Sequence, residues 1–165
     1  MTTDEAIPEL DHFGPDEAWR LGAGMVSRCR SADLSVVVVI QLGQQRVFHA
    51  ALPGTSADND GWAERKARVV AHFGLSSAAV FDRYVKDNPE FFRLFALAPE
   101  RYAPFPGAVP IKVRGTVVGT LAVSGLAGEE DHQLAVDALR GEAAIQVEGR
   151  SPAGPEPRSD RSERR

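Results

Sequence analysis

Residues 53–66 form the polar segment of this sequence that is best suited to binding chemistry. They join a predicted strand to a predicted helix, and the free N–H groups at a helix start attract anions. Arg65 and Lys66 follow one turn into that helix, where a guanidinium can bind an anion through two hydrogen bonds. We therefore predict that Asn59, Arg65 and Lys66 bind a small anionic ligand. An ordinary capped helix is the alternative interpretation, because the aspartates of the segment would themselves occupy the positive helix end.

Residues 124–132 form a second polar segment, which connects a predicted strand to the start of a predicted helix. His132 falls in the first turn of that helix, where the helix dipole favours the neutral imidazole. Because a neutral imidazole can bind a metal ion or relay a proton, His132 is the best metal-ligand candidate, and Ser124 and Asp131 are further ligand-binding candidates. Asp131 is not expected to face the same way as His132, because adjacent helix positions diverge. A structural or exposed histidine is the alternative interpretation.

The common catalytic motifs do not occur in this sequence. It contains neither a GxxxxGK[ST] phosphate loop nor a GxSxG nucleophile turn. Cys29 is its one cysteine, which excludes an intramolecular disulfide and a zinc site of paired cysteines. No two histidines stand at the four-residue spacing of a helical zinc site. Whether the protein is an enzyme stays open, since action on a small hydroxy- or keto-acid would depend on Arg65 and His132 alone.

The length of 165 residues predicts one domain, and the formal charge of −4 argues against a nucleic-acid-binding protein, which is expected to be basic. The longest apolar run, residues 36–40, is far shorter than the roughly 20 residues that cross a bilayer. The start of the chain carries acids where an export signal needs basic and apolar residues. The sequence therefore predicts a cytoplasmic protein that binds neither membranes nor nucleic acids.

Both ends of the chain are expected to lie outside the folded domain. Residues 1–14 are predicted to form a loose acidic leader, and residues 149–165 lack large apolar side chains and are predicted to be disordered. Residues 150–165 hold five arginines and three acids, a net charge of +2. A solvated tail is preferred over one that touches RNA or acidic lipid. The folded domain is predicted to span residues 15–148.

The hydrophobic pattern predicts helices that alternate with two hairpins. Tight turns join consecutive strands, so their pairing is antiparallel and a doubly wound fold is disfavoured. Asn59 or Asp60 is expected to cap the helix that follows the first hairpin. The sequence thus predicts an α+β fold with a single antiparallel sheet of two hairpins and packed helices. The predicted elements are a helix at 16–29, a hairpin of 35–42 and 46–52, helices at 61–73, from 76 onward and at 89–97, a hairpin of 109–114 and 116–124, and a helix at 129–142.

Aromatic residues are concentrated between residues 81 and 105, a segment that holds seven of the twelve in the chain. A short helix at 89–97 cannot bury Phe91, Phe92 and Phe95 on one side, so some of them are expected to be exposed in a monomer. This exposure predicts a homo-oligomer interface or an apolar ligand pocket. A second small core is the alternative interpretation.

Three segments together resemble a known family. Residues 106–125, with the sequence PGAVPIKVRGTVVGTLAVSG, are similar to the GGxPI…G…VG…GVSG signature of the GlcG/HbpS-like superfamily, also called the haem-degrading domain. With residues 52–66 and 123–132, they resemble a subgroup of small uncharacterised cytoplasmic proteins. The resemblance covers residues 16–143. Ala108 departs from the pattern, in which a second glycine is expected nearby.

The resemblance implies a profilin-like fold that assembles into dimers and larger rings. It also implies haem as a candidate cofactor, through haem binding or degradation. Arg65 and Lys66 would then pair with the haem propionates. The candidate ligands of the haem iron are His132, His72, His49, Cys29 and Tyr102.

The residues and the resemblance together support two functional hypotheses. The first is a homo-oligomeric small-ligand-binding protein of this superfamily, with haem binding or degradation as one form of it. It requires that the helix starts near Trp62 and Glu129 open toward a common cleft. The alternative is a non-catalytic assembly or adaptor module that acts through protein–protein contacts of the segment 81–105. The predicted ligand-binding residues are Asn59, Arg65, Lys66, Ser124, Asp131 and His132.

Overall fold

A five-stranded sheet with the strand order β1-β4-β5-β2-β3 forms the centre of the computed structural model, which describes residue 4 and residues 7–150. Both predicted hairpins are present, and they join through antiparallel pairing of β2 with β5. The predicted α+β fold with one sheet is confirmed, and β1 adds a short edge strand parallel to β4. The strands are β1 (Glu9–Leu10), β2 (Val37–Leu42), β3 (Gln45–Ala51), β4 (Ala108–Val113) and β5 (Thr116–Ser124).

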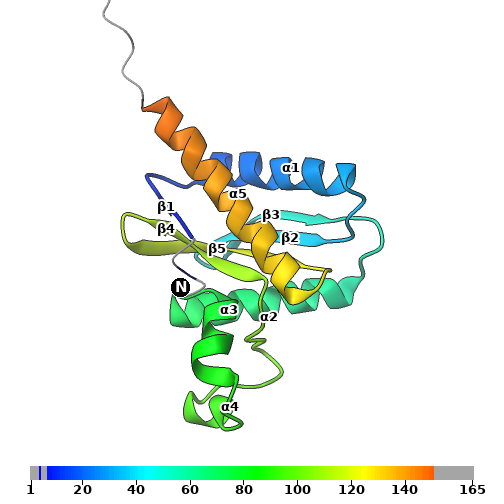
Figure 1. Cartoon of the computed structure of the whole chain (residues 1–165), viewed down its shortest axis with the longest axis vertical. Coiled ribbons are helices and arrows are strands. Elements are labelled where there is room, and N and C mark those ends of the chain that lie inside the picture. The colour runs from blue at the N-terminus through cyan, green and yellow to red at the C-terminus, as the bar shows by residue number, and fades with distance from the viewer. Residues whose placement is uncertain (1–3, 5–6, 151–165) are drawn as a thin grey trace, which may run out of the picture.

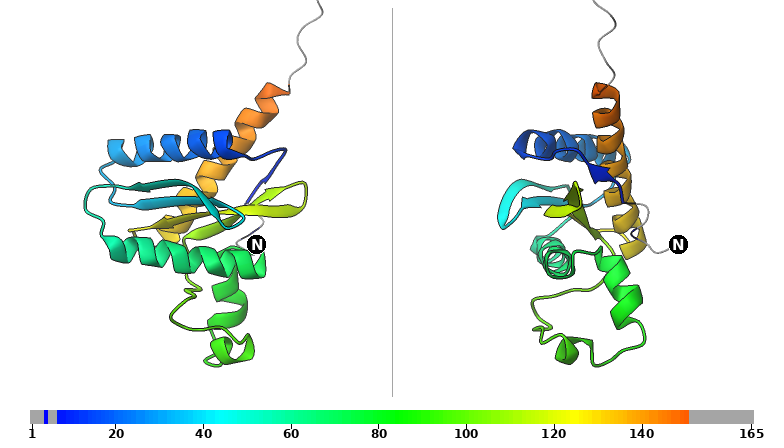
Figure 2. Two further views of the ribbon diagram at one scale, coloured as in Figure 1. Left: turned by 180° about the vertical axis from the view of Figure 1, so that it is seen from behind. Right: turned by 90° about the vertical axis from the view of Figure 1, so that its left-hand side faces the viewer.

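Helices cover both faces of this sheet. Helices α1 and α5 pack on one face and α2 packs on the other, so that the sheet is the middle of three layers (Figures 1 and 2). The shorter helical segments follow α2 and extend away from the sheet. The helical elements are α1 (Pro15–Ser31), α2 (Ala57–Phe73), α3 (Ser77–Val80), the π-helical turn η2 (Phe81–Val85), α4 (Phe91–Leu94) and α5 (Gly128–Gly149).

The apolar run at the start of β2 explains the three layers. Side chains of a strand point alternately to its two faces. Val36, Val38 and Ile40 belong to the core beneath α1 and α5, whereas Val37 and Val39 belong to the core beneath α2. A run without polar alternation therefore buries a strand on both faces, as expected for a central strand.

The predicted loose leader is packed against the sheet in its described part. Ile7 and Leu10 are 8% and 3% exposed and join the core beneath α5. The backbone N–H of Asp11 donates to the side chain of Gln146 on α5, at 2.9 Å. Burial of two apolar side chains and pairing of β1 with β4 thus hold this acidic segment along the edge of the sheet. The remaining leader positions and residues 151–165, most of the predicted tail, lie outside the described residues.

Helix α2 begins one turn earlier than predicted. Its N-cap is Ser56 rather than Asn59 or Asp60. The Asn59 side chain instead reaches back and accepts a hydrogen bond from the backbone N–H of Ser56, at 2.9 Å. Such a reciprocal cap needs a polar side chain at the third helical position, which Asn59 supplies. The early start places Asp58 inside the first turn of the helix.

The aromatic segment forms a small core of its own. Phe91 is 1% exposed and packs against Phe73 and Phe95 beside Val69 of α2. This packing is the alternative considered above, and it explains how a short helix accommodates neighbouring aromatic rings: α2 supplies the surface that the helix lacks. Leu94, 61% exposed, stays at the surface of this segment. Within the described part of the chain, no helix combines the length and apolarity needed to cross a bilayer.

Candidate functional site

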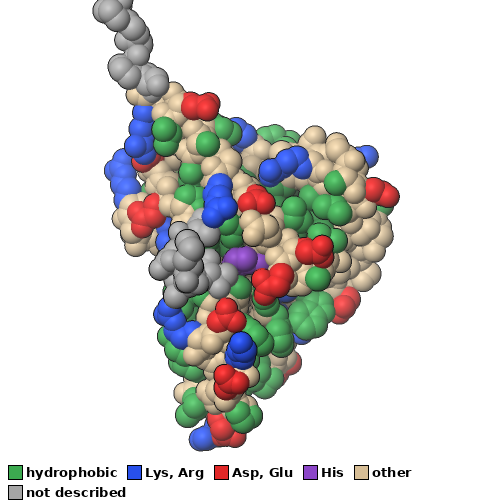
Figure 3. All heavy atoms as spheres, in the orientation of Figure 1, with side chains coloured by type: hydrophobic (Ala, Val, Ile, Leu, Met, Phe, Trp, Pro, Cys, Tyr) green, Lys and Arg blue, Asp and Glu red, His purple; other side chains and the backbone are tan. Residues whose placement is uncertain are grey.

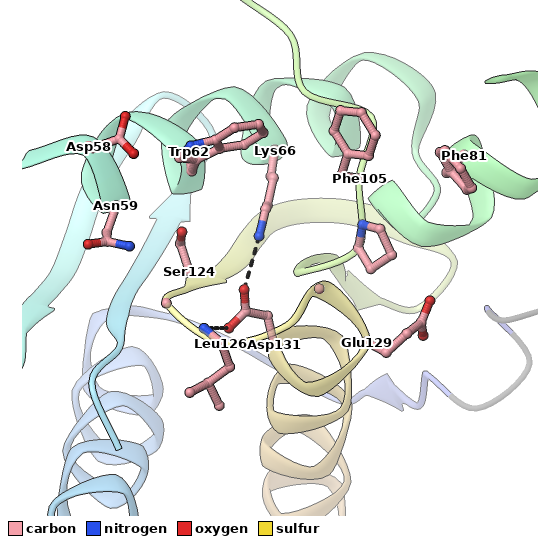
Figure 4. A pocket seen from close by; sticks show the side chains of 13 residues that line it. Asp58, Asn59, Trp62, Lys66, Phe81, Phe105, Ser124, Leu126, Glu129 and Asp131 are labelled. Carbon is pink, nitrogen blue, oxygen red and sulfur yellow. Dashed lines mark hydrogen bonds and ion pairs between the residues drawn. The ribbon is translucent and has the colours of Figure 1, made fainter. Parts of the chain in front are cut away.

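A cavity of about 530 Å³ lies between the first three turns of α2 and the junction of β5 with α5 (Figure 4). The two helix starts therefore do open toward a common cleft. Residues of α2, of the loop that precedes β4 and of the start of α5 line the cavity. Residues far apart in the sequence consequently share one site.

A buried ion pair forms the floor of this cavity. The Lys66 ammonium lies 3.1 Å from an Asp131 carboxylate oxygen, and the two residues are 5% and 1% exposed. Lys66 also donates to the backbone oxygen of Val123, at 3.2 Å, and the second Asp131 oxygen accepts from the Leu126 N–H, at 3.0 Å. Among the described residues, two of the three ammonium hydrogens thus have acceptors, which leaves one for a ligand.

Two glycines with positive φ angles shape the backbone around this pair. Gly107 has a φ of +136°, and a Cβ there would lie 2.5 Å from the Lys66 nitrogen. Gly125 has a φ of +150°, and a Cβ there would lie 2.1 Å from the backbone oxygen of Ser35. L-residues with side chains rarely adopt such angles. The backbone at both positions therefore depends on glycine, and the floor of the cavity depends on that backbone.

Burial changes the proton affinity of both partners. It lowers the pKa of Lys66 and raises the pKa of Asp131, because the low-dielectric surroundings disfavour each charge, while their mutual attraction opposes both shifts. An ionisable pair with perturbed pKa values at the floor of a cavity is a typical property of functional sites. The geometry and the electrostatics thus both indicate Lys66 and Asp131 as the functional groups of the cavity.

Aromatic rings form one wall of the cavity. The Trp62 and Phe105 rings meet edge to face with centroids 6.1 Å apart, and Phe81 lies 5.7 Å from Phe105. The guanidinium of Arg65 lies over the Trp62 ring, 4.3 Å from its centroid, and its Nε donates to the Gly61 carbonyl. The wall offers an apolar aromatic surface that a ring of a ligand can contact.

The charges around the cavity do not favour an anion. Asp58 and Glu129 line it together with Asp131, so that three carboxylates accompany the single ammonium of Lys66. Acidic side chains also gather over the start of α5 on the surface (Figure 3). The expectation of an anionic ligand was based on the start of the helix that carries Arg65 and Lys66, but acidic residues occupy the first turn of that helix and also that of α5.

The chain matches a family model described as haem-degrading protein HbpS-like over residues 13–140. It belongs to the HbpS-like family. A UPF0303 protein of Streptomyces avermitilis is 47% identical over 143 residues, which cover 81% of this chain and 88% of the relative. The family resemblance inferred from residues 106–125 is thereby confirmed.

Solved structures of the HbpS-like fold are similar as well. That of Ybr137w has a TM-score of 0.78 and 27% identity, and the match covers 87% of this chain and 85% of that one. The structure of a complex of PduOC with haem has a TM-score of 0.67 and 19% identity, covering 78% of this chain and 93% of that one. At that level of identity, the second likeness supports the fold alone.

Four of the six predicted ligand-binding residues line this cavity of the HbpS-like fold, namely Asn59, Lys66, Ser124 and Asp131. Arg65 and His132 do not line it. Adjacent helix positions point about 100° apart, so each of these two residues turns away from the neighbour that faces the cavity. Sequence reasoning missed Trp62, although it precedes Lys66 by four residues and so lies on the same helix face. It also missed Phe105, which comes from a loop without periodicity.

His132 lies buried beside the cavity rather than in it. It is 6% exposed, and its Nδ1 has no hydrogen-bond partner among the described residues. The same part of the chain contains no cluster of three His, Cys, Asp or Glu side chains suited to a metal ion. A role of His132 as a metal ligand therefore stays a prediction.

Stability is expected to fall as the pH falls below neutrality because of His132. Burial lowers the pKa of His132 from its ordinary value of 6.5, despite the opposing charges of Glu129, Asp4 and Asp82. The stabilisation by the neutral His132 imidazole is complete above the pKa that this residue has in the unfolded chain. It is lost as the pH falls through the lower pKa of the folded protein, at up to about 1.4 kcal/mol per pH unit. Urea unfolding at several pH values should show that the free energy of unfolding declines less with falling pH in His132→Gln than in the wild type. The decline in His12→Gln should equal that of the wild type. An equal decline in both variants would contradict this assignment.

Proposed function

We propose that this protein binds a small organic molecule in the cavity between α2 and α5. The observation that supports this proposal best is the buried Lys66–Asp131 pair at the floor of a cavity of about 530 Å³. Small-molecule sites typically combine a cavity of this size with mostly apolar walls and a few fixed polar groups. The wall formed by Trp62 and Phe105 and the floor formed by the ion pair provide that combination.

The lining residues define the class of ligand. A planar ring would stack on Trp62, and a carbonyl or carboxylate oxygen would accept the remaining Lys66 hydrogen. Asp58 and Glu129 would attract a positively charged group at the other end of the ligand. A planar compound that carries both an amine and a carboxylate fits these demands better than a simple anion.

Three probes that share one ring test this ligand class. Isothermal titration calorimetry with L-tryptophan, tryptamine and indole-3-acetate compares a zwitterion with a cation and an anion. L-Tryptophan is expected to bind at least about tenfold more tightly than indole-3-acetate, because one hydrogen bond to a charged group contributes about 1.5 kcal/mol or more. L-Tryptophan should also bind more tightly than tryptamine, which lacks the carboxylate that accepts the Lys66 hydrogen, and the double variant Lys66→Met/Asp131→Leu should lose this second preference.

The matched control for this experiment is Lys86→Met, which removes an exposed lysine that does not line the cavity. It should bind all three probes as the wild type does. Equal affinities of the double variant and the wild type for L-tryptophan would overturn the proposal that the Lys66–Asp131 pair contacts the ligand. A lack of saturable heat with every probe would overturn the ligand class.

Haem binding is a second candidate function. The family description and the PduOC complex with haem favour it. The cavity between α2 and α5 does not fit the iron, however, because among the described residues no imidazole, thiol, thioether or phenol lines it. If haem binds to this chain, residues elsewhere must hold the iron.

Self-association also remains a proposal. Because the aromatic segment packs as a small core, Phe91 is not available to a partner. Leu94 and Phe105, 61% and 44% exposed, are the large apolar residues of that segment that a second copy could contact. A role as an assembly module would therefore depend on these two side chains.

A further inference from the structure

Lys66 differs from the other lysines of the chain in what surrounds its amine. The sequence contains three lysines, and neither Lys86 nor Lys112 lines the cavity between α2 and α5. The Lys66 side chain reaches from α2 toward Asp131 at the start of α5, along the floor of the cavity (Figure 4). Of the three lysine amines, that of Lys66 is therefore the one that a ligand in this cavity meets.

The hydrogen bonds of this nitrogen leave one direction open. An ammonium group donates three hydrogens in a tetrahedral arrangement. One points to the Asp131 carboxylate, at 3.1 Å, and one to the backbone oxygen of Val123, at 3.2 Å. The third has no acceptor among the described residues, and a carbonyl oxygen of a ligand can accept it. The carbonyl carbon then lies next to the nitrogen.

Asp131 can take a proton from Lys66. Its carboxylate oxygen already accepts a hydrogen bond from the ammonium, so the proton has a short path. Burial lowers the pKa of Lys66 and raises the pKa of Asp131, which brings the proton affinities of the two groups closer together. The transfer gives a neutral amine, which is the nucleophilic form of lysine.

We infer that Lys66 condenses with the carbonyl group of a bound aldehyde to form an imine. Asp131 accepts one ammonium proton, the amine nitrogen forms a bond to the carbonyl carbon, and Asp131 passes the proton to the carbonyl oxygen. A second proton moves from the nitrogen to the same oxygen through Asp131, and the carbon–oxygen bond breaks to release water. The nitrogen keeps its third proton, so the product is a protonated imine.

The charges at the floor favour a carbonyl compound over an acyl donor. A protonated imine carries the same positive charge as the ammonium, so the Asp131 carboxylate keeps its counter-ion. Acylation of Lys66 would instead give a neutral amide. It would leave the carboxylate, on a residue that is 1% exposed, without a counter-ion, which is strongly unfavourable. The buried pair thus selects the reaction that preserves its charges.

The remaining lining residues narrow the class of carbonyl compound. An aromatic ring would contact the wall formed by Trp62 and Phe105. Asp58 and Glu129 are acids, and Lys66 is the one cation among the described lining residues. An uncharged aromatic aldehyde therefore fits better than an aromatic 2-oxo acid, whose carboxylate these acids would repel. This inference rests on the small-molecule site proposed above.

Reductive trapping with benzaldehyde tests the reaction on the full-length protein. Cyanoborohydride reduces an imine to a stable secondary amine, and peptide mapping by mass spectrometry identifies the labelled lysine. Lys66 should be labelled at least about tenfold faster than Lys86 or Lys112, because the cavity holds the aldehyde next to the amine. The two other lysines serve as internal controls that require no substitution. The ratio of labelling at Lys66 to that at Lys86 should be smaller with phenylglyoxylate, the corresponding 2-oxo acid.

Asp131→Asn tests the proton transfer. This variant keeps the size of the side chain but removes the proton acceptor and the counter-ion. Labelling of Lys66 should slow at least about tenfold, since positioned acid–base groups contribute that much or more, whereas labelling of Lys86 should not change. Circular dichroism checks that the variant is folded. Unchanged labelling of Lys66 in the folded variant would overturn the role of Asp131.

Calorimetry with L-tryptophan separates failure of the imine from failure of the binding site. Equal labelling of Lys66 and Lys86 in the wild type, together with saturable binding of L-tryptophan, would overturn the imine and leave the binding site in place. Equal labelling without saturable heat from any of the three calorimetric probes would overturn both.

Discussion

Asp131→Ala is expected to lower the free energy of unfolding by about 3–5 kcal/mol, because it leaves the Lys66 ammonium buried without its counter-ion. The remaining acceptor, the Val123 carbonyl, carries no charge that could replace the carboxylate. The Leu126 N–H at the start of α5 would lose its acceptor as well. Urea unfolding followed by circular dichroism gives the difference.

The double variant Lys66→Met/Asp131→Leu should be within about 1.5 kcal/mol of the wild type, since apolar residues of similar volume often replace a buried ion pair at little cost. The surface pair of Arg68 with Glu64 provides the comparison, because both side chains are at least one-third exposed. Glu64→Ala should cost less than about 1 kcal/mol. If Asp131→Ala costs no more than Glu64→Ala, the pair is not desolvated as described.

Gly125→Ala is the second substitution with a large expected effect, a loss of about 3–5 kcal/mol of unfolding free energy from backbone strain and overpacking together. The new Cβ would lie 2.1 Å from the Ser35 backbone oxygen and 2.9 Å from the Val36 Cα. Backbone atoms next to a central strand cannot move aside as a flexible side chain can. The β5–α5 junction would shift, and the cavity floor would shift with it.

Gly115→Ala is the matched control for this substitution. Gly115 also has a positive φ, +80°, but nothing lies within 4 Å of a Cβ at that position. Its cost is expected to be about 1–3 kcal/mol, from backbone strain alone. Thermal and urea unfolding of both variants measure the difference. Equal losses would show that strain rather than the contact with Ser35 governs Gly125.

The fold could be predicted largely from local patterns. The run from Val36 to Ile40 identified a strand buried on both faces, and tight turns identified two hairpins. These features depend on side-chain alternation and on turn geometry, which act over a few residues. The predictions from sequence were wrong where a few side chains pack against residues that are distant in the chain. Ile7 and Leu10 look isolated in an acidic leader until α5 and β4 provide the surface that buries them.

The candidate site was predictable only in part for the same reason. Residues 53–66 and 124–132, two of the segments that line the cavity, could be identified from sequence, because polar residues at strand ends and helix starts are visible as local patterns. The packing of distant segments determines that Lys66 meets Asp131 rather than solvent, that Phe105 completes the wall, and that Arg65 and His132 turn away. Contacts between residues 65 positions apart depend on how three layers pack, and packing is a property of the whole core rather than of any one segment.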